Sequence, residues 1–168
     1  MQRLLMISLV ALAAGCTSYR IESPARPIPA PPAPAPGLAE VCVVRPHTFA
    51  NLVPVVVRDN GVLVGGTLGA SYFCWQEVPG LHHIETESGD DVDRALGTAA
   101  HDRARVTAEP GRRYYLHQSL GNLYGISGLA WVDEATGRAM IDQCDYKLLR
   151  GVPGSEALPT GAPVAAAR

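Results

Sequence analysis

The sequence predicts an all-β fold, an antiparallel β-sandwich of about seven to nine strands, over residues 40–149. Three observations support this fold class. Short runs rich in Val, Tyr, Phe and Trp recur along this part of the chain. Turn signals built from Gly, Pro and Asn separate the runs at intervals of about ten residues. No predicted strand is followed by a long amphipathic helix, which argues against an alternating β–α design.

Recognisable turns bound the predicted strands. Asp59-Asn60-Gly61 favours a tight hairpin, because Asn and Gly both tolerate positive φ at the central turn positions. Pro79-Gly80, Glu109-Pro110-Gly111 and Thr136-Gly137 predict later turns. In chain order, the predicted strands cover residues 41–44, 53–58, 62–65, 70–78, 81–86, 103–108, 112–120, 129–132 and 138–142. Residues 92–100 are consistent with a helical turn, and residues 146–149 either close a sheet or form a short helix.

The N-terminus resembles the signal and lipidation segment of bacterial lipoproteins. Arg3 precedes an apolar run over residues 4–14, which is shorter than the roughly 20 residues that a spanning helix needs. Leu12-Ala13-Ala14-Gly15-Cys16 is similar to the box in which cleavage leaves a lipid-bearing cysteine first. We therefore expect residues 1–15 to be a signal peptide and Cys16 to be the lipid attachment site. The alternatives are an ordinary secretory signal with an incidental cysteine and an uncleaved anchor.

Segments rich in Pro and Ala flank the predicted domain. Residues 16–39 are expected to form a lipid-anchored linker, because the run SPARPIPAPPAPAPG favours polyproline II, which extends about 3.1 Å per residue. Residues 150–168 contain Pro, Gly and Ala with few apolar anchors and are predicted to be a disordered tail. The chain thus divides into signal, linker, one domain and tail.

Charge and composition narrow the possible partners. The chain carries 14 basic and 16 acidic residues, for a formal net charge of −2. No Lys/Arg-rich stretch is present, so nucleic acid is not an expected partner. Contact with the membrane is expected through acyl chains, and two or more chains anchor a protein stably. Thr17 follows the cysteine, and in lipoproteins a residue other than Asp at that position implies the outer membrane.

Three further cysteines lie in the predicted domain. Cys42 and Cys74 fall in the middle of strongly apolar strand patterns, whereas Cys144 stands between polar residues. In an oxidising periplasm two of the three can pair, and three pairings are possible. The Cys42–Cys74 pair is favoured. Pairs with Cys144, or three buried free thiols, are the alternatives.

Several strand-and-turn motifs resemble the domain-of-unknown-function 2846 family of small bacterial lipoproteins. They are Val43-Val44-Arg45-Pro46, Asp59-Asn60-Gly61, Tyr72-Phe73, Pro79-Gly80-Leu81-His82 and Pro110-Gly111-Arg112-Arg113-Tyr114-Tyr115. The resemblance covers residues 41–149. It implies a β-sandwich related to the PEGA type and a location in the cell envelope, and it brings no catalytic residues.

The histidines and acidic residues do not predict a metal site. His82 and His83 are neighbours on a predicted strand and therefore point to opposite faces. His83 shares a face with Glu85, and a loop offers Asp90, Asp91 and Asp93. Neither group has the ligand spacing of a zinc or calcium site. We expect no metal and no cofactor.

No catalytic constellation is evident either. The segment Gly125-Ile126-Ser127-Gly128 lacks the spacing of a nucleophile elbow. His47 and His101 are the only plausible loop bases, and each needs a partner from another loop. Tyr124, in a glycine-rich loop, is the best candidate for a contact surface.

The sequence therefore predicts a lipid-anchored protein of the cell envelope, in the outer membrane, whose domain is a non-catalytic binding or structural module. Its ligand is not predicted. The expected partners are the membrane, through the lipid, and another envelope protein. An accessory subunit of a larger envelope complex is one alternative. A periplasmic enzyme or metal-binding protein is another.

Overall fold

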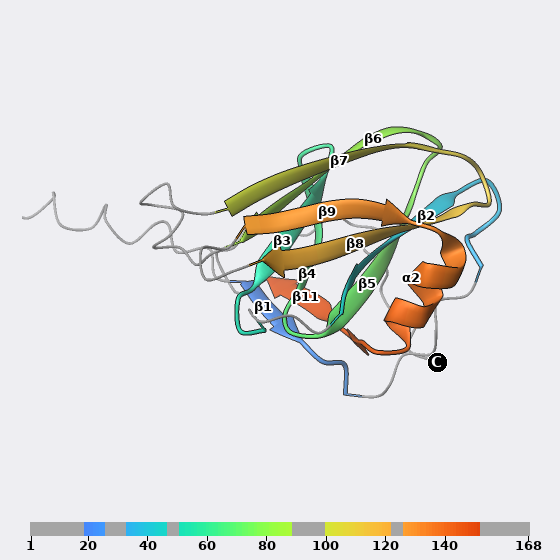
Figure 1. Cartoon of the computed structure of the whole chain (residues 1–168). Helices are drawn as coiled ribbons and strands as arrows, with labels where there is room; N and C mark the ends of the chain where they lie inside the picture. The colour runs from blue at the N-terminus through green and yellow to red at the C-terminus, as the bar shows by residue number, and fades with distance from the viewer. Residues whose placement is uncertain (1–18, 26–32, 47–50, 89–99, 122–125, 152–168) are drawn as a thin grey trace, which may run out of the picture.

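Within the part of the chain that the structure describes, two β-sheets packed face to face, a two-stranded ribbon and one helix form the fold (Figure 1). The computed structural model describes residues 19–25, 33–46, 51–88, 100–121 and 126–151. The all-β sandwich predicted from the sequence is confirmed.

The larger sheet has five strands. Their order is β10 (Asp145–Tyr146), β5 (Ser71–Glu77), β2 (Ala39–Arg45), β8 (Arg113–Gly121) and β9 (Ile126–Val132). The smaller sheet has the order β4 (Val62–Thr67), β3 (Val55–Asp59), β6 (Gly80–Ser88) and β7 (Ala100–Ala108). The ribbon pairs β1 (Tyr19–Glu22) with β11 (Leu148–Gly151), and the helix is α2 (Glu134–Ile141). Most pairings are antiparallel, but β2–β8 and β5–β10 are parallel, which the prediction did not include.

Strand β2 lies at the centre of the larger sheet, and every one of its residues is buried. Val41 and Val43 face the smaller sheet and pack in one core cluster with Val57 and Ile84. Cys42 and Val44 face the other way. They belong to a second cluster, whose cover comes from α2 and the segments beside it. Because side chains alternate along β2, the strand contributes residues to two hydrophobic cores, one on each face of the sheet.

The predicted hairpin after β3 is present. Asn60 and Gly61 have φ values of 48° and 81°, as a two-residue turn with positive φ at both positions requires. Asp59 pairs with Val62 across this turn, and a register shift follows at Val57/Arg58.

Among the described strands, the chain crosses between the two larger sheets four times. Connections β2–β3, β4–β5, β5–β6 and β7–β8 each leave one sheet and enter the other. The β5–β6 crossing is short, because only Val78 and Pro79 separate Glu77 from Gly80. Each crossing brings the end of a strand in one sheet against the start of a strand in the other.

The predicted turn at Thr136-Gly137 and the predicted return strand over residues 138–142 are wrong. The structure has helix α2 there. Asp133 caps its N-terminus by accepting a 2.9 Å hydrogen bond from the Thr136 N–H, and Glu134 pairs with Arg138 one turn later. The residue types of the cap and of the ion pair are typical of a helix, but the Thr136-Gly137 pair favoured a turn in the prediction.

Gly137 is required by close packing. It is buried in α2, and a Cβ added there would overlap the ring of Tyr115 on β8. Since Tyr115 is itself buried within the second core cluster, its ring has little room to move away. Glycine therefore lets the helix approach the sheet, at a cost in helix propensity of about 1 kcal/mol.

The paired region extends beyond both predicted domain boundaries. Strand β1 lies inside residues 16–39, expected to be linker, and pairs with β11, which runs to Gly151. The signal peptide, residues 26–32 of the Pro-rich run and residues 152–168 lie outside the described residues, as does nearly all of the predicted helical turn at 92–100.

Gly137→Ala is expected to destabilise the protein by about 1–3 kcal/mol, because overpacking against Tyr115 outweighs the gain in helix propensity. Equilibrium unfolding in denaturant measures the change. Ala139→Gly, at an exposed position of the same helix, is the control and is expected to cost about 1 kcal/mol through propensity alone. A Gly137→Ala protein more stable than wild type would contradict the close packing.

Candidate functional site

A surface groove of about 740 Å³ is the larger of two cavities described in the structure. Ligand pockets commonly measure about 300–1,000 Å³. The groove lies where β8 begins, where β9 ends and where α2 begins, next to the segment that precedes β2. Its lining residues are Ala33, Pro34, Val106, Gly111, Arg112, Arg113, Tyr114, Tyr115, Trp131, Val132, Asp133, Glu134 and Arg138.

Three arginines line the groove, and each has a carboxylate partner. Arg112 pairs with Glu109 at 2.9 Å, and Arg138 pairs with Glu134 at 2.6 Å. Arg113 pairs with Glu40. Because these charges are compensated, the groove is not a concentrated anion-binding surface.

Two aromatic side chains are held in fixed positions at the groove. Tyr114 and Trp131 meet edge to face with ring centroids 6.3 Å apart. The Trp131 indole N–H donates to the Arg105 carbonyl at 2.8 Å, and the Tyr114 hydroxyl accepts from the Glu109 N–H at 3.0 Å. These bonds hold both rings in fixed positions at the groove.

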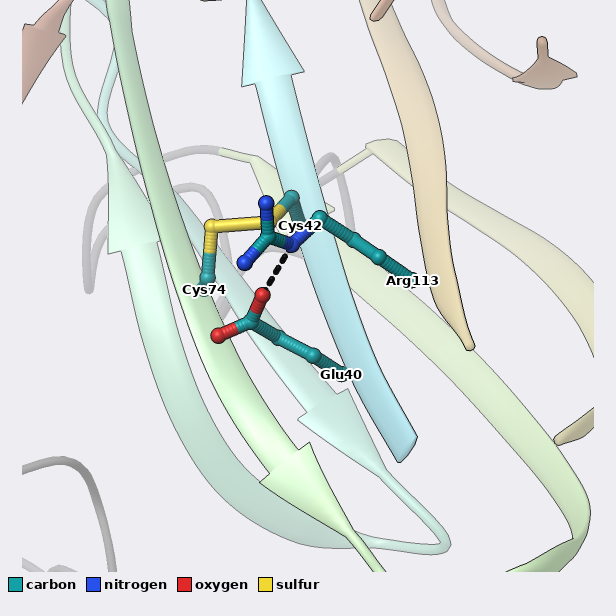
Figure 2. The surroundings of a disulfide bond; sticks show 4 residues. All are labelled: Glu40, Cys42, Cys74 and Arg113. Carbon is teal, nitrogen blue, oxygen red and sulfur yellow. Dashed lines mark hydrogen bonds and ion pairs between the residues drawn. A yellow bond between two sulfur atoms is a disulfide. The ribbon is translucent and has the colours of Figure 1, made fainter. Parts of the chain in front are cut away.

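A disulfide joins Cys42 to Cys74 beneath this end of the sheet. The two residues are direct partners on β2 and β5, with Cα atoms 4.0 Å apart. This is the pairing that the sequence favoured. Figure 2 shows the Glu40 carboxylate and the Arg113 guanidinium lying beside the disulfide. Burial raises the pKa of Glu40, and the Arg113 ion pair opposes that rise.

Cys144 is the free cysteine among the described residues. It packs against the cluster that contains the disulfide, and its thiol donates to the Arg45 carbonyl at 3.5 Å. Burial, assisted by the charge of Asp145, raises its pKa to about 11. Since the thiolate is the reactive form, Cys144 is a weak nucleophile at neutral pH.

A second polar cluster lies at the β5–β6 crossing, and none of its residues lines the groove. His82 and Asp59 are both buried, and His82 Nδ1 is 2.8 Å from Asp59 Oδ2. The Trp75 indole N–H donates to the same oxygen at 3.1 Å, and His82 Nε2 is 2.9 Å from the Val78 carbonyl. Glu77 completes the group, with a carboxylate oxygen within 4.8 Å of both other side chains.

The environment shifts two pKa values in this cluster. Burial alone lowers the pKa of His82, but the Val78 carbonyl and the Asp59 carboxylate outweigh burial, so the pKa is raised. Burial and the charge of Asp59 both raise the pKa of Glu77. Sequence analysis missed this group, because Asp59 looked like a turn residue and its partners lie 16 to 23 positions away.

The residues singled out from the sequence are scattered. His83 is exposed on the face opposite His82, and its neighbour Glu85 pairs with Arg103 at 3.0 Å. His101 is exposed on β7 and does not line the groove. Outside the described residues lie Cys16, His47, Tyr124, Asp90, Asp91 and Asp93.

Comparison of the chain with protein-family models gives no match, and comparison with curated proteins gives none. The resemblance to the domain-of-unknown-function 2846 family therefore stays a prediction. Within the described residues, no helix is long and apolar enough to cross a bilayer.

Removal of the disulfide by Cys42→Ala with Cys74→Ala is expected to cost about 3–4 kcal/mol, given the 32-residue separation that the bond closes. Denaturant unfolding of the oxidised wild type and the double variant measures this. Cys144→Ala is the matched control and is expected to cost clearly less, because it opens no loop. Equal stability of wild type and double variant would contradict the pairing.

Proposed function

We propose that this chain is a lipid-anchored protein of the bacterial cell envelope, with a non-catalytic β-sandwich that binds or supports another envelope protein. The lipidation motif at Leu12–Cys16 supports the anchor, and Thr17 supports the outer membrane as its location. The likeness of residues 41–149 to the domain-of-unknown-function 2846 family supports the same setting.

The groove at the β8–β9–α2 end is the observation that carries the binding role. It combines fixed aromatic rings, Tyr114 and Trp131, with arginines whose charge is already compensated. Aromatic and Arg side chains are enriched where proteins bind proteins. Nucleic acid binds to surfaces with an excess of positive charge, so a groove whose arginines are all paired with carboxylates is poorly suited to it.

The chemistry of the lining residues favours binding over catalysis. Among the described residues that line the groove, none is His, Ser, Cys or Lys, and the two carboxylates are already engaged: Asp133 caps α2 and Glu134 pairs with Arg138. A role as an accessory subunit of a larger envelope complex is the second candidate. Stable co-purification with a fixed set of proteins distinguishes it from transient binding.

Cys16→Ser tests the anchor. Without the thiol the lipid cannot be attached, so the precursor is expected to stay unprocessed or to be released in soluble form by another peptidase. Fractionation of cells and the size of the product measure the outcome. A substituted protein of mature size that stays with the membrane would contradict lipidation at Cys16.

Photo-crosslinking from the groove tests the binding role. A photoreactive residue at position 138 is expected to capture a defined partner in intact cells. Arg112→Glu in the same protein reverses a charge that lines the groove and is expected to weaken that capture. Arg112 and Arg138 have largely exposed side chains, so these changes spare the core. The control places the photoreactive residue at Arg103, which is exposed on β7. Identical products from both positions would contradict a role for the groove.

A further inference from the structure

Asp59, Glu77 and His82 meet at the crossing from one sheet to the other. Asp59 ends β3, Glu77 ends β5, and His82 lies near the start of β6. Each offers one ligand atom, and these atoms lie within 4.8 Å of one another. Ligand atoms that share one tetrahedral zinc ion are roughly 3–4 Å apart, so small side-chain rotations suffice to close such a site.

The hydrogen bonds of His82 leave Nδ1 as its ligating nitrogen. A carbonyl oxygen only accepts, so Nε2 carries a proton and donates to Val78 at 2.9 Å. The Asp59 carboxylate also only accepts, so without an ion Nδ1 donates to Asp59 Oδ2 at 2.8 Å, and a metal ion binds Nδ1 by displacing that proton to solvent. A ligating histidine usually donates its other N–H to a carbonyl or carboxylate in this way.

The Asp59 carboxylate is oriented and incompletely satisfied. It is 3% exposed, and its Oδ2 accepts from the Trp75 indole. Its other oxygen, Oδ1, is buried and accepts no hydrogen bond from the described residues. A buried carboxylate oxygen without a partner is costly, so this atom is available to a ligand that supplies positive charge.

We infer that Asp59, Glu77 and His82 form a binding site for one divalent transition-metal ion, with Zn²⁺ as the best match. One imidazole nitrogen and two carboxylate oxygens are a donor set that zinc takes, whereas calcium requires six to eight oxygens. The ion compensates two carboxylates that face one another in a largely buried place. This site goes beyond the proposed binding role of the groove.

The position of the site gives the ion a structural role. Asp59 and His82 belong to the smaller sheet, and Glu77 belongs to the larger one. One ion therefore ties both sheets together where the chain crosses between them. Glu77 is only half-buried and is followed by exposed Val78, which leaves a route for the ion to enter and a fourth position for water.

The other group of possible ligands is Glu40, Cys42 and Cys74. Both of its sulfur atoms are joined in the disulfide. Zinc binds cysteine only as a thiolate, so this group does not compete for the ion while the disulfide is intact.

Zinc titration of the full-length protein, purified in detergent without a histidine tag and stripped with a chelator, tests the site. Calorimetry with zinc chloride is expected to give one ion per chain, and zinc is expected to raise the Tm. Glu77→Gln and His82→Ala are each expected to lower zinc affinity at least about tenfold, since loss of even an outer-shell partner costs about 10–100-fold. Glu77→Gln decides the test if the buried His82→Ala protein fails to fold.

Two neighbouring substitutions are the controls. His83→Ala and Glu85→Gln alter the same residue types on the exposed face of β6, and each is expected to keep wild-type zinc affinity and the zinc-induced rise in Tm. A wild-type protein that binds no zinc overturns the inference. So does a Glu77→Gln protein with unchanged affinity, or a loss in the controls as large as in Glu77→Gln.

Discussion

Burial of both faces of β2 is the constraint on which the other elements depend. A strand with seven consecutive buried residues needs apolar cover on two sides, and one β-sheet supplies only one of them. The smaller sheet covers Val41 and Val43, while α2 and its neighbours cover Cys42 and Val44. The close approach of Gly137 to Tyr115 and the cross-strand disulfide both serve this second core.

The same strand also organises the groove. Glu40, near the start of β2, is buried and charged, so it needs a cation, which Arg113 supplies from the adjacent β8. That pair fixes the guanidinium at the base of the groove. The more exposed Arg112 and Arg138 then define the rim with their own partners. The position of Arg113 in the groove thus depends on its pairing with a buried carboxylate.

Buried polar contacts join the two sheets, and in each contact the residue of the smaller sheet ends its strand: Asp59 ends β3 and Thr67 ends β4. Trp75 of the larger sheet donates to Asp59 of the smaller one, and the Thr67 hydroxyl donates to Gln118 at 2.5 Å in the opposite direction between the sheets. Because these groups are buried, their hydrogen bonds align the sheets more specifically than apolar packing does. The cluster with Glu77 and His82 adds a place for a cation to one of these contacts.

The sequence by itself determined the fold class, most strand positions, the Asn60-Gly61 hairpin and the opposite orientation of His82 and His83, because all of these depend on local propensity and on the two-residue period of a strand. Helix α2 depends on the tertiary structure. Gly137 has a low helix propensity, and its presence in the helix is explained by the close approach to Tyr115. The tertiary structure also decided strand β1, whose partner β11 lies more than a hundred residues away. Tertiary structure likewise assembled the groove and the Asp59–Glu77–His82 cluster, since distant strand ends meet only when the chain crosses between sheets, and no local pattern encodes those contacts.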